Sequence, residues 1–292
     1  MFARFGSNSD LIWALAIQAV VCWAVFCALS RWTRGWSNRA LDVAAAGTLA
    51  LLFLFIGLAW DRVWLAQAIP LPNLVVLGNA FPVLTVMLAA NIWRRVTLSA
   101  RRQTIVLAAL AATGLLTVFW PVAGRAPQCG DDWLPDGTCL QTTRFTCSAA
   151  CAATLLRAHG IAATEQEMAD LCLTRRGTTW MGLFRGLKKK TAGTPWDVTV
   201  AECSVDDLRR MDDGPMILRV GLDYGSVVDE SCAVELGWHP GLRHSVVLRG
   251  FVAGERADVS DPTPEIGREF WTLDELRQVW QGQAIRLVRR AP

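Results

Sequence analysis

The sequence predicts an α-helical bundle of four membrane spans followed by an α+β domain with an antiparallel sheet. Charged residues make up 19% of the 292-residue chain and hydrophobic residues 52%, whereas an ordinary soluble domain is about a quarter charged. The apolar surplus falls in four uncharged runs in the first half of the chain. In the second half, helical patterns come first and strand patterns follow, an order typical of α+β domains.

Each apolar run is about as long as a helix that crosses hydrocarbon, near 20 residues. The runs are Leu11–Leu29, Val43–Trp60, Leu74–Ile92 and Thr104–Trp120, within a membrane domain predicted over residues 1–123. The first has no small-x-small cleavage site before a globular sequence, so we interpret it as a retained anchor. Asn79 and Pro82 predict a kink in the third, with Asn79 directed at neighbouring helices. A role of this run in substrate passage is the alternative.

Arginines in the connections predict the orientation of the spans. The first connection carries Arg31, Arg34 and Arg39, and the third carries Arg94, Arg95, Arg101 and Arg102. The second has only Arg62, beside Asp61. Cytoplasmic loops are rich in Lys and Arg, so the first and third connections should be cytoplasmic and both termini outside. This predicts a multi-pass protein of the bacterial inner membrane with a periplasmic second domain. The net charge of +3 is too small to indicate a nucleic-acid partner.

Residues 124–138 are rich in Gly, Pro and Asp and predict a linker before a domain over residues 139–292. Helices are predicted at Ser148–Ala158, from a capping box at Thr164–Glu167, at Gly182–Lys190, and from a capping box at Thr272–Glu275 to Trp280. Strands are predicted at Asp197–Ala201, Met216–Val220, Ser245–Val252, Ala257–Ser260 and Ala284–Val288, with a hairpin turn at Ala253–Arg256.

One cysteine lies where a helix would activate it. Cys147 comes directly before an apolar helical segment, and a helix N-terminus lowers the pKa of a thiol. A base must reach it in space, and His244 opens a predicted strand that would hold it rigidly. Asp261 follows the paired strand, so the hairpin would bring it beside His244 to orient the imidazole.

Other residues compete for these roles. Among the three histidines, His159 lies at a helix end, where a structural cap is the better interpretation, and His239 precedes a proline in a loop. Asp258 is the alternative to Asp261, but it lies inside the predicted strand.

The segment Gln141-Thr-Thr-Arg-Phe-Thr-Cys147-Ser-Ala-Ala-Cys151 resembles the start of the double-glycine leader peptidases. These are papain-like domains, usually found at the N-terminus of bacteriocin-exporting ABC transporters. In that family a Gln lies six residues before the nucleophile and a second Cys commonly lies four residues after it. Both spacings are present here. One departure is Thr146-Cys147-Ser148, where the family usually has Asp-Cys-Gly.

Further segments resemble the family's later elements in the same order, so that the resemblance covers roughly Cys139 to Leu287. They are the Gly-Thr loop in Arg175–Gly182, the histidine strand His244–Leu248, the aspartate–proline element Val259–Pro262, and the closing helix and tail in Phe270–Leu276 and Trp280–Gly282.

The resemblance implies a cysteine peptidase that cleaves after small residues such as Gly-Gly, and the four apolar runs predict that it is anchored in the membrane. Cys147 would attack the peptide carbonyl, His244 would transfer the proton, and Asp261 would hold the imidazole tautomer. Gln141 and the Cys147 N–H would stabilise the oxyanion. The implied partners are a peptide or protein substrate, membrane lipid and a membrane or export partner; no cofactor or metal is implied.

The cysteine count gives a separate expectation. Outside the cytoplasm thiols are oxidised, and seven cysteines lie beyond the spans, so Cys147 would be the one left over from three disulfides. Cys129 with Cys139 is the simplest pair. The other four, Cys151, Cys172, Cys203 and Cys232, would form two pairs, and the sequence does not choose among the three connectivities. Alternatively, Cys151 is a small buried apolar residue.

Rival functions have weaker support. A zinc site lacks C-x2-C or H-x3-H spacing, and a thiol oxidoreductase of the vitamin K epoxide reductase kind would need a C-x-x-C element. A catalytically silent domain that binds peptides for a membrane partner is the serious alternative, although the chain keeps Cys, His, Asp and Gln. Amidase or transglutaminase-like acyl transfer would use the same triad. No phosphate loop of the Gly-x4-Gly-Lys type is present.

Overall fold

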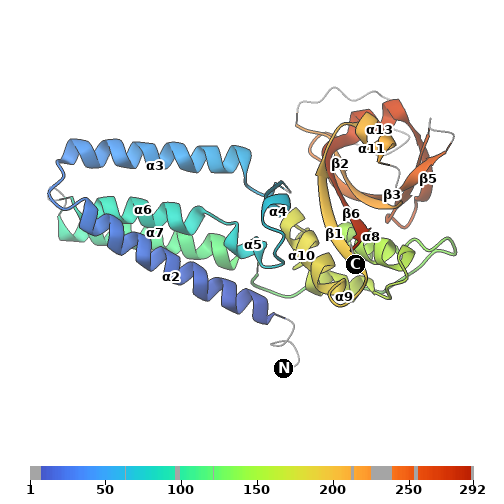
Figure 1. Ribbon diagram of the computed structural model, residues 1–292, viewed down its shortest axis with the longest axis horizontal. Helices are drawn as coiled ribbons and strands as arrows, with labels where there is room; N and C mark the ends of the chain where they lie inside the picture. The colour runs from blue at the N-terminus through green and yellow to red at the C-terminus, as the bar shows by residue number, and fades with distance from the viewer. Residues whose placement is uncertain are drawn as a thin grey trace. The chain divides into compact units, whose positions relative to one another are not determined.

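The computed structural model describes residues 8–290, apart from residues 63, 96–98, 121, 212–213, 225–238 and 253–255. The chain divides into two compact units, each visible in Figure 1. The first unit is Met1–Leu65 with Leu71–Ala123, and the second is Ala66–Pro70 with Gly124–Pro292. The hairpin turn predicted at Ala253–Arg256 lies mostly outside the described residues.

The first unit is a helical bundle centred on α6 (Phe81–Trp93), which packs against three longer helices. These are α2 (Ser9–Trp32), α3 (Asn38–Leu58) and α7 (Ala100–Phe119); α5 (Leu74–Leu77) is short, and the short α4 (Trp64–Ala68) is divided between the two units. Among the described residues, four segments are long and apolar enough to cross a membrane: α2, α3, the stretch Leu74–Trp93 and α7. They correspond to the four predicted runs.

The third apolar segment is broken between α5 and α6, and Asn79 lies in the break. Its Oδ1 accepts a hydrogen bond from the N–H of Phe81 at 3.0 Å, and its Nδ2 donates to the carbonyl of Thr117 at 3.0 Å. The buried side chain of Gln18 donates to the Asn79 carbonyl at 3.1 Å. Asn79 therefore faces its neighbours as predicted. Pro82 lies in the first turn of α6, where its missing N–H costs nothing.

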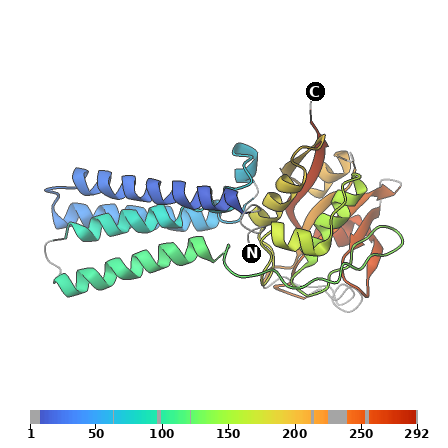
Figure 2. The ribbon, with the colours of Figure 1, turned by 90° about the horizontal axis from the view of Figure 1, so that it is seen from below.

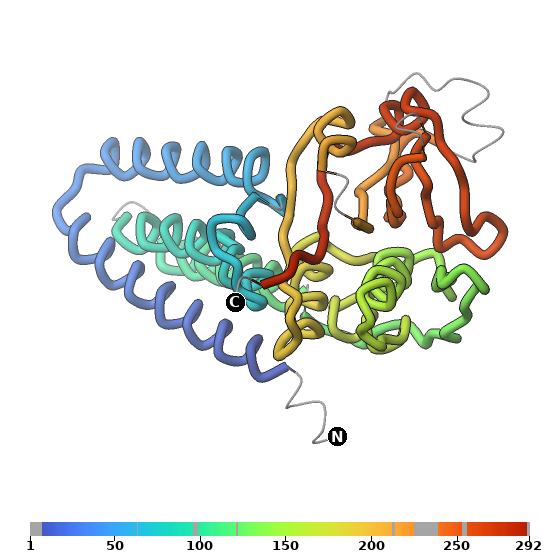
Figure 3. The backbone as a smooth tube through the Cα atoms, turned by 45° about the vertical axis from the view of Figure 1, so that its right-hand side comes forward, coloured from blue at the N-terminus to red at the C-terminus, as the bar shows by residue number. Residues whose placement is uncertain are grey.

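The second unit combines a helical layer with an antiparallel sheet. The helices that come first are α8 (Cys147–Ala158), α9 (Glu165–Leu171) and α10 (Trp180–Lys190). The strands are β1 (Trp196–Glu202), β2 (Met216–Gly221), β3 (Arg243–Val252), β4 (Arg256–Asp261), β5 (Gly267–Thr272) and β6 (Trp280–Arg289), in the spatial order β1-β6-β2-β3-β4-β5. In Figure 3 the green and yellow part of the chain that carries these three helices comes before the orange and red part that carries most of the strands. The predicted α+β class with an antiparallel sheet is confirmed.

Helices cover both faces of the sheet. α8 packs on β2 and β3, and α10 packs on β1; Figure 2 shows these helices against the strands. The opposite face of β2 to β4 forms an apolar core with α11 (Val205–Arg210) and α13 (Leu273–Val279). Successive strand residues point to opposite faces, so Leu218 packs in this core while its neighbour Ile217 does not.

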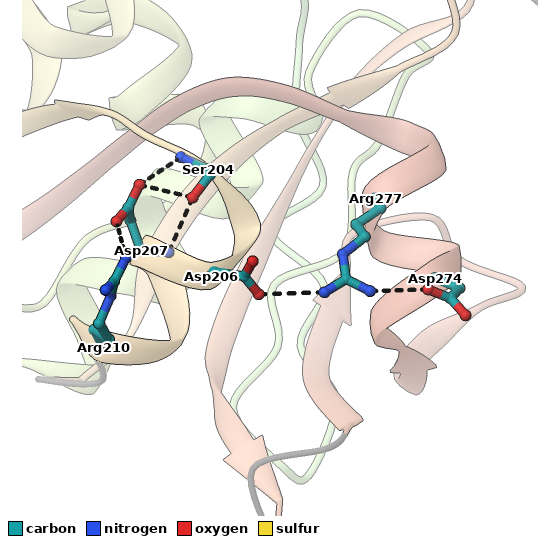
Figure 4. A network of polar contacts seen from close by, with 6 residues as sticks. All are labelled: Ser204, Asp206, Asp207, Arg210, Asp274 and Arg277. Carbon is teal, nitrogen blue, oxygen red and sulfur yellow. Dashed lines mark hydrogen bonds and ion pairs between the residues drawn. The ribbon is translucent and has the colours of Figure 1, made fainter.

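Surface polar contacts join α11 to α13, as Figure 4 shows. Arg277 pairs with Asp274 of its own helix at 2.9 Å and with Asp206 of α11 at 3.2 Å. Ser204 and Asp207 form a complete capping box at the start of α11. The Ser-x-x-Asp spacing in the sequence is a capping signal for this helix, but α11 was not predicted from it. Exposed ion pairs of this kind add little stability, so they set the helix positions more than they strengthen the fold.

The helix predicted from the capping box at Thr272–Glu275 is confirmed as α13, whereas Phe270 and Trp271 of the family-like segment Phe270–Leu276 lie in β5. Thr164 does cap α9, but no reciprocal bond from Glu167 is recorded, and this carboxylate pairs with Lys190 instead. Residues 124–138 are tied to the second unit, for example by the bridge between Trp133 and Cys139.

Candidate active site

Cys147 is the first residue of α8. The helix starts without a side-chain cap, because the hydroxyl of Thr146 instead accepts from the N–H of Thr143 at 3.0 Å and donates to the Thr143 carbonyl at 2.9 Å. The first N–H groups of a helix have no acceptor within it, and their partial positive charge favours an anion. The thiol of Cys147 therefore lies where a thiolate is stabilised, as the sequence predicted.

His244 and Asp261 lie near the same end of the β3–β4 hairpin, in which Val247 pairs with Ser260. The Nε2 atom of His244 is 3.0 Å from Oδ1 and 3.0 Å from Oδ2 of Asp261. The side chains are 13% and 3% exposed, so water screens this pair little. The imidazole also hydrogen-bonds with the Cys147 thiol. Since Asp261 engages Nε2, Nδ1 is the nitrogen left for the sulfur.

The three groups shift one another's protonation. Burial alone would lower the pKa of His244, but the hydrogen bonds from Asp261 and Cys147 raise it to about 10. Burial would raise the pKa of the Cys147 thiol, yet the hydrogen bond and charge of His244 lower it below its ordinary value. The pKa of Asp261 is likewise lowered by His244 against the effect of burial. These directions favour a thiolate–imidazolium pair held by a carboxylate.

Gln141 is tied to the aspartate–proline element, because its N–H donates to the carbonyl of Pro262 at 2.7 Å. Its side-chain Oε1 is buried and has no hydrogen-bond partner among the described residues. The next residue, Thr142, is anchored by the fully buried carboxylate of Glu165, which accepts from its N–H at 2.8 Å and its hydroxyl at 2.5 Å. The loop that carries Gln141 is thus held at two points, while the side-chain Oε1 of Gln141 makes no hydrogen bond among the described residues.

The competing residues have structural partners. His159 ends α8; its Nδ1 lies 2.8 Å from the carbonyl of Leu155 and its ring packs edge-on against Trp196. His239 is exposed. Asp258 binds Arg268 through two bonds of 2.8 and 2.7 Å. The structure therefore brings together Cys147, His244 and Asp261 and leaves the alternatives elsewhere.

The predicted disulfides are not present among the described residues. The cysteines expected to pair, Cys129, Cys139, Cys151, Cys172 and Cys203, are all free thiols. The sixth, Cys232, lies outside the described residues. Local contacts explain the difference, since the thiol of Cys151 donates to the carbonyl of Ser245 at 3.1 Å and that of Cys172 packs against the backbone of Gly186. Cys151 matches the alternative of a small buried residue.

Two residues that the sequence did not nominate complete the surroundings of the thiol. The N–H of Ser245 hydrogen-bonds with the sulfur of Cys147, and its hydroxyl lies 2.8 Å from that of Ser148. The sequence did contain a sign of Ser148, because this chain has a serine at residue 148 where the family's Asp-Cys-Gly pattern has a glycine. Over the part of the chain that is described, no three His, Cys, Asp or Glu side chains are placed to hold a metal ion.

Comparison with known proteins gives solved structures of similar fold, while no family model and no curated protein matches the chain. The peptidase domain of Streptococcus ComA, a bifunctional ABC transporter, has a TM-score of 0.40 and 19% identity over 52% of this chain and 96% of that domain. A double-glycine motif protease from an AMS/PCAT transporter, in complex with the leader peptide, has a TM-score of 0.40 and 16% identity over 57% and 95%. The peptidase domain of Streptococcus mutans ComA has a TM-score of 0.35 and 19% identity over 51% and 96%. These matches cover just over half of this chain and nearly all of each of those domains.

Proposed function

We propose that the protein is a membrane-anchored cysteine peptidase with a papain-like catalytic domain over residues 139–292 and the triad Cys147, His244 and Asp261. The observation that carries this proposal is the continuous chain of contacts from the thiol through the imidazole to the carboxylate at the start of α8. A buried thiol with only a packing role has a raised pKa, as Cys151 does because of its burial. Cys147 differs from it in this respect.

The first half of the reaction forms a thioester. The Cys147 thiolate attacks the carbonyl carbon of the scissile peptide, and the carbonyl oxygen becomes an oxyanion. The N–H of Cys147 and the amide of Gln141 donate to that oxyanion. The imidazolium of His244 then gives its proton to the leaving amine as the C–N bond breaks. The new amino terminus leaves and the acyl group stays on the sulfur.

The second half restores the enzyme. Neutral His244 takes a proton from water, and the resulting hydroxide attacks the thioester. The C–S bond breaks, which releases the carboxylic acid product and regenerates the thiolate and the imidazolium. Asp261 keeps the Nε2–H tautomer throughout, because both its oxygens face Nε2, so that Nδ1 exchanges protons on the side of the sulfur.

The substrate class follows from the motif resemblance. We propose cleavage of peptides or proteins after small residues, with the double-glycine leader as the first sequence to test. A related acyl transfer would use the same groups, and only the identity of the attacking nucleophile, water or an amine, would differ.

The catalytic domain is proposed to lie outside the bacterial inner membrane. Arginines gather at one end of the bundle, where Arg94 donates to the carbonyl of Ser30 at 2.6 Å and Arg95 pairs with Asp42. This is the end predicted to be cytoplasmic. After the fourth span the chain lies on the side of the membrane opposite to the arginines, which is the outer side. Cys147 should therefore react with a membrane-impermeant maleimide in intact spheroplasts. A thiol that reacts only after lysis would reverse the orientation.

A cleavage assay separates the peptidase from a silent peptide-binding domain. Purified full-length protein is incubated with peptides that contain Gly-Gly and with a diverse peptide mixture, and the products are identified by mass spectrometry. Wild type should produce defined fragments, and Cys147→Ala should produce none. Cys203→Ala, which alters a cysteine away from the site, should match wild type. Peptide binding without cleavage by wild type would favour the silent domain.

A further inference from the structure

Two buried serine hydroxyls meet beside the thiol of Cys147. Ser148 Oγ and Ser245 Oγ lie 2.8 Å apart, and the two residues are 6% and 4% exposed. Ser148 is the second residue of α8, and Ser245 follows the base His244 in β3. The reaction described above uses neither hydroxyl.

Ser245 contacts α8 at three points. Its N–H hydrogen-bonds with the sulfur of Cys147, its hydroxyl meets that of Ser148, and its carbonyl accepts from the thiol of Cys151 at 3.1 Å. Because Ser245 is adjacent to His244 in the chain, these contacts fix the strand that carries the base against the helix that carries the nucleophile.

The number of hydrogens on the two hydroxyls determines which serine donates the hydrogen bond between them. Ser148 Oγ lies 4.0 Å from Cys147 Sγ. A thiolate can only accept a hydrogen bond, so when Cys147 is ionised Ser148 must be the donor in this contact. A hydroxyl has a single hydrogen to donate. The hydrogen between the two serines must therefore come from Ser245.

We propose that Ser245 and Ser148 form a two-step donor chain, Ser245 to Ser148 to Cys147, that positions and stabilises the nucleophilic thiolate. The inference deepens the proposed function and rests on it. Both serines are positioning residues, and the hydroxyl of Ser245 acts through Ser148. Donors directed at the charged form of a group favour that form. Ser148 thereby gains a role at the position where the resembling family usually has Gly.

The groups that titrate around the sulfur come from three elements: His244 from β3, Asp261 from β4 and Cys151 from α8. Removal of either hydroxyl leaves all three in place. A change in the pH at which Cys147 becomes reactive, relative to wild type, therefore measures the loss of the donor chain alone.

The test measures the rate of Cys147 alkylation by iodoacetamide against pH in the full-length protein in detergent. Fragmentation of the tryptic peptide over residues 145–157 distinguishes Cys147 from Cys151. Ser148→Ala and Ser245→Ala should each raise the midpoint of the profile by roughly half to one pH unit, because each weakens hydrogen bonding to a charged group. The double variant should shift no further than Ser148→Ala alone. Ser245→Thr keeps the hydroxyl and should retain the wild-type midpoint.

Thr138→Val is the matched control. It removes one hydroxyl of a similar buried pair, in which Thr138 donates to Ser260 at 3.0 Å. Neither of these residues acts on the pKa of Cys147, so the midpoint should be unchanged. The inference is overturned if Ser148→Ala and Ser245→Ala fold normally by circular dichroism and keep the wild-type midpoint, or if their shifts add in the double variant. If Ser148→Ala does not fold, Ser148→Gly is measured in its place. A wild-type midpoint at the ordinary thiol value would instead contradict the proposed function itself.

Discussion

The Nε2 atom of His244 lies 3.0 Å from each carboxylate oxygen of Asp261. One of these oxygens also accepts from the N–H of Thr263 at 2.8 Å, so the carboxylate is held from both sides. The aspartate is thus fixed by its own loop before it orients the imidazole. This arrangement makes the protonation of the whole triad depend on one buried carboxylate.

Asp261→Asn should narrow the pH range of activity. The ion pair exists above the lowered pKa of Cys147 and below the raised pKa of His244, about 10. Without the carboxylate charge the pKa of His244 falls, so the alkaline limb moves to lower pH. The acid limb should not move to higher pH, because His244 and not Asp261 lowers the pKa of Cys147. We expect kcat/KM at the optimum to fall at least about 10-fold. A profile with unchanged limbs would contradict the assignment of Asp261.

Gln141→Ala should slow turnover without changing the thiolate. Removal of one oxyanion donor typically costs about 100-fold or more in kcat, whereas the amide of Gln141 makes no recorded contact with Cys147. Steady-state kinetics and Cys147 alkylation are measured together. Gln166→Ala is the matched control in the same unit, because its side chain accepts from the N–H of Cys129 at 3.0 Å and donates to Asp170 at 3.4 Å. Equal losses in both variants would argue for a general effect on folding.

The sequence predicted the features that depend on local patterns. Four apolar runs predicted the four long apolar segments, and the position of Cys147 before an apolar stretch predicted the start of α8. It did not predict that Ser245 would reach Cys147, Ser148 and Cys151, because that meeting depends on how β3 packs against α8. The disulfide prediction was wrong for the described cysteines, because the number of cysteines says nothing about which thiols lie close together. Cys151 and Cys172 have separate buried partners.

Asn79→Leu should destabilise the membrane bundle. The substitution leaves the N–H of Phe81 and the carbonyl of Thr117 without their partner at the break in the third apolar segment. An unsatisfied buried polar group costs about 1–3 kcal/mol. Thermal unfolding in detergent should show a lower midpoint than wild type. Thr113→Ala, which removes an exposed hydroxyl bonded only within α7, should have little effect.

Glu165→Ala should loosen the loop that carries Gln141. The buried carboxylate satisfies both the N–H and the hydroxyl of Thr142, and its loss leaves these donors without an acceptor at a cost of about 1–3 kcal/mol. We expect a lower unfolding midpoint and faster amide exchange at Thr142. Glu167→Ala removes a partly exposed carboxylate two residues along α9 and should cost less. Equal exchange at Thr142 in both variants would contradict this role.

The central claim is that Cys147 forms a covalent acyl intermediate. The most direct measurement is an acid quench during turnover of a cleaved peptide, followed by mass spectrometry of the intact protein and of the peptide over residues 145–157. The account predicts a thioester on Cys147 that adds the mass of the amino-terminal product minus water and disappears when the substrate is exhausted. Undiminished cleavage by Cys147→Ala, or an adduct on a different residue, would contradict it.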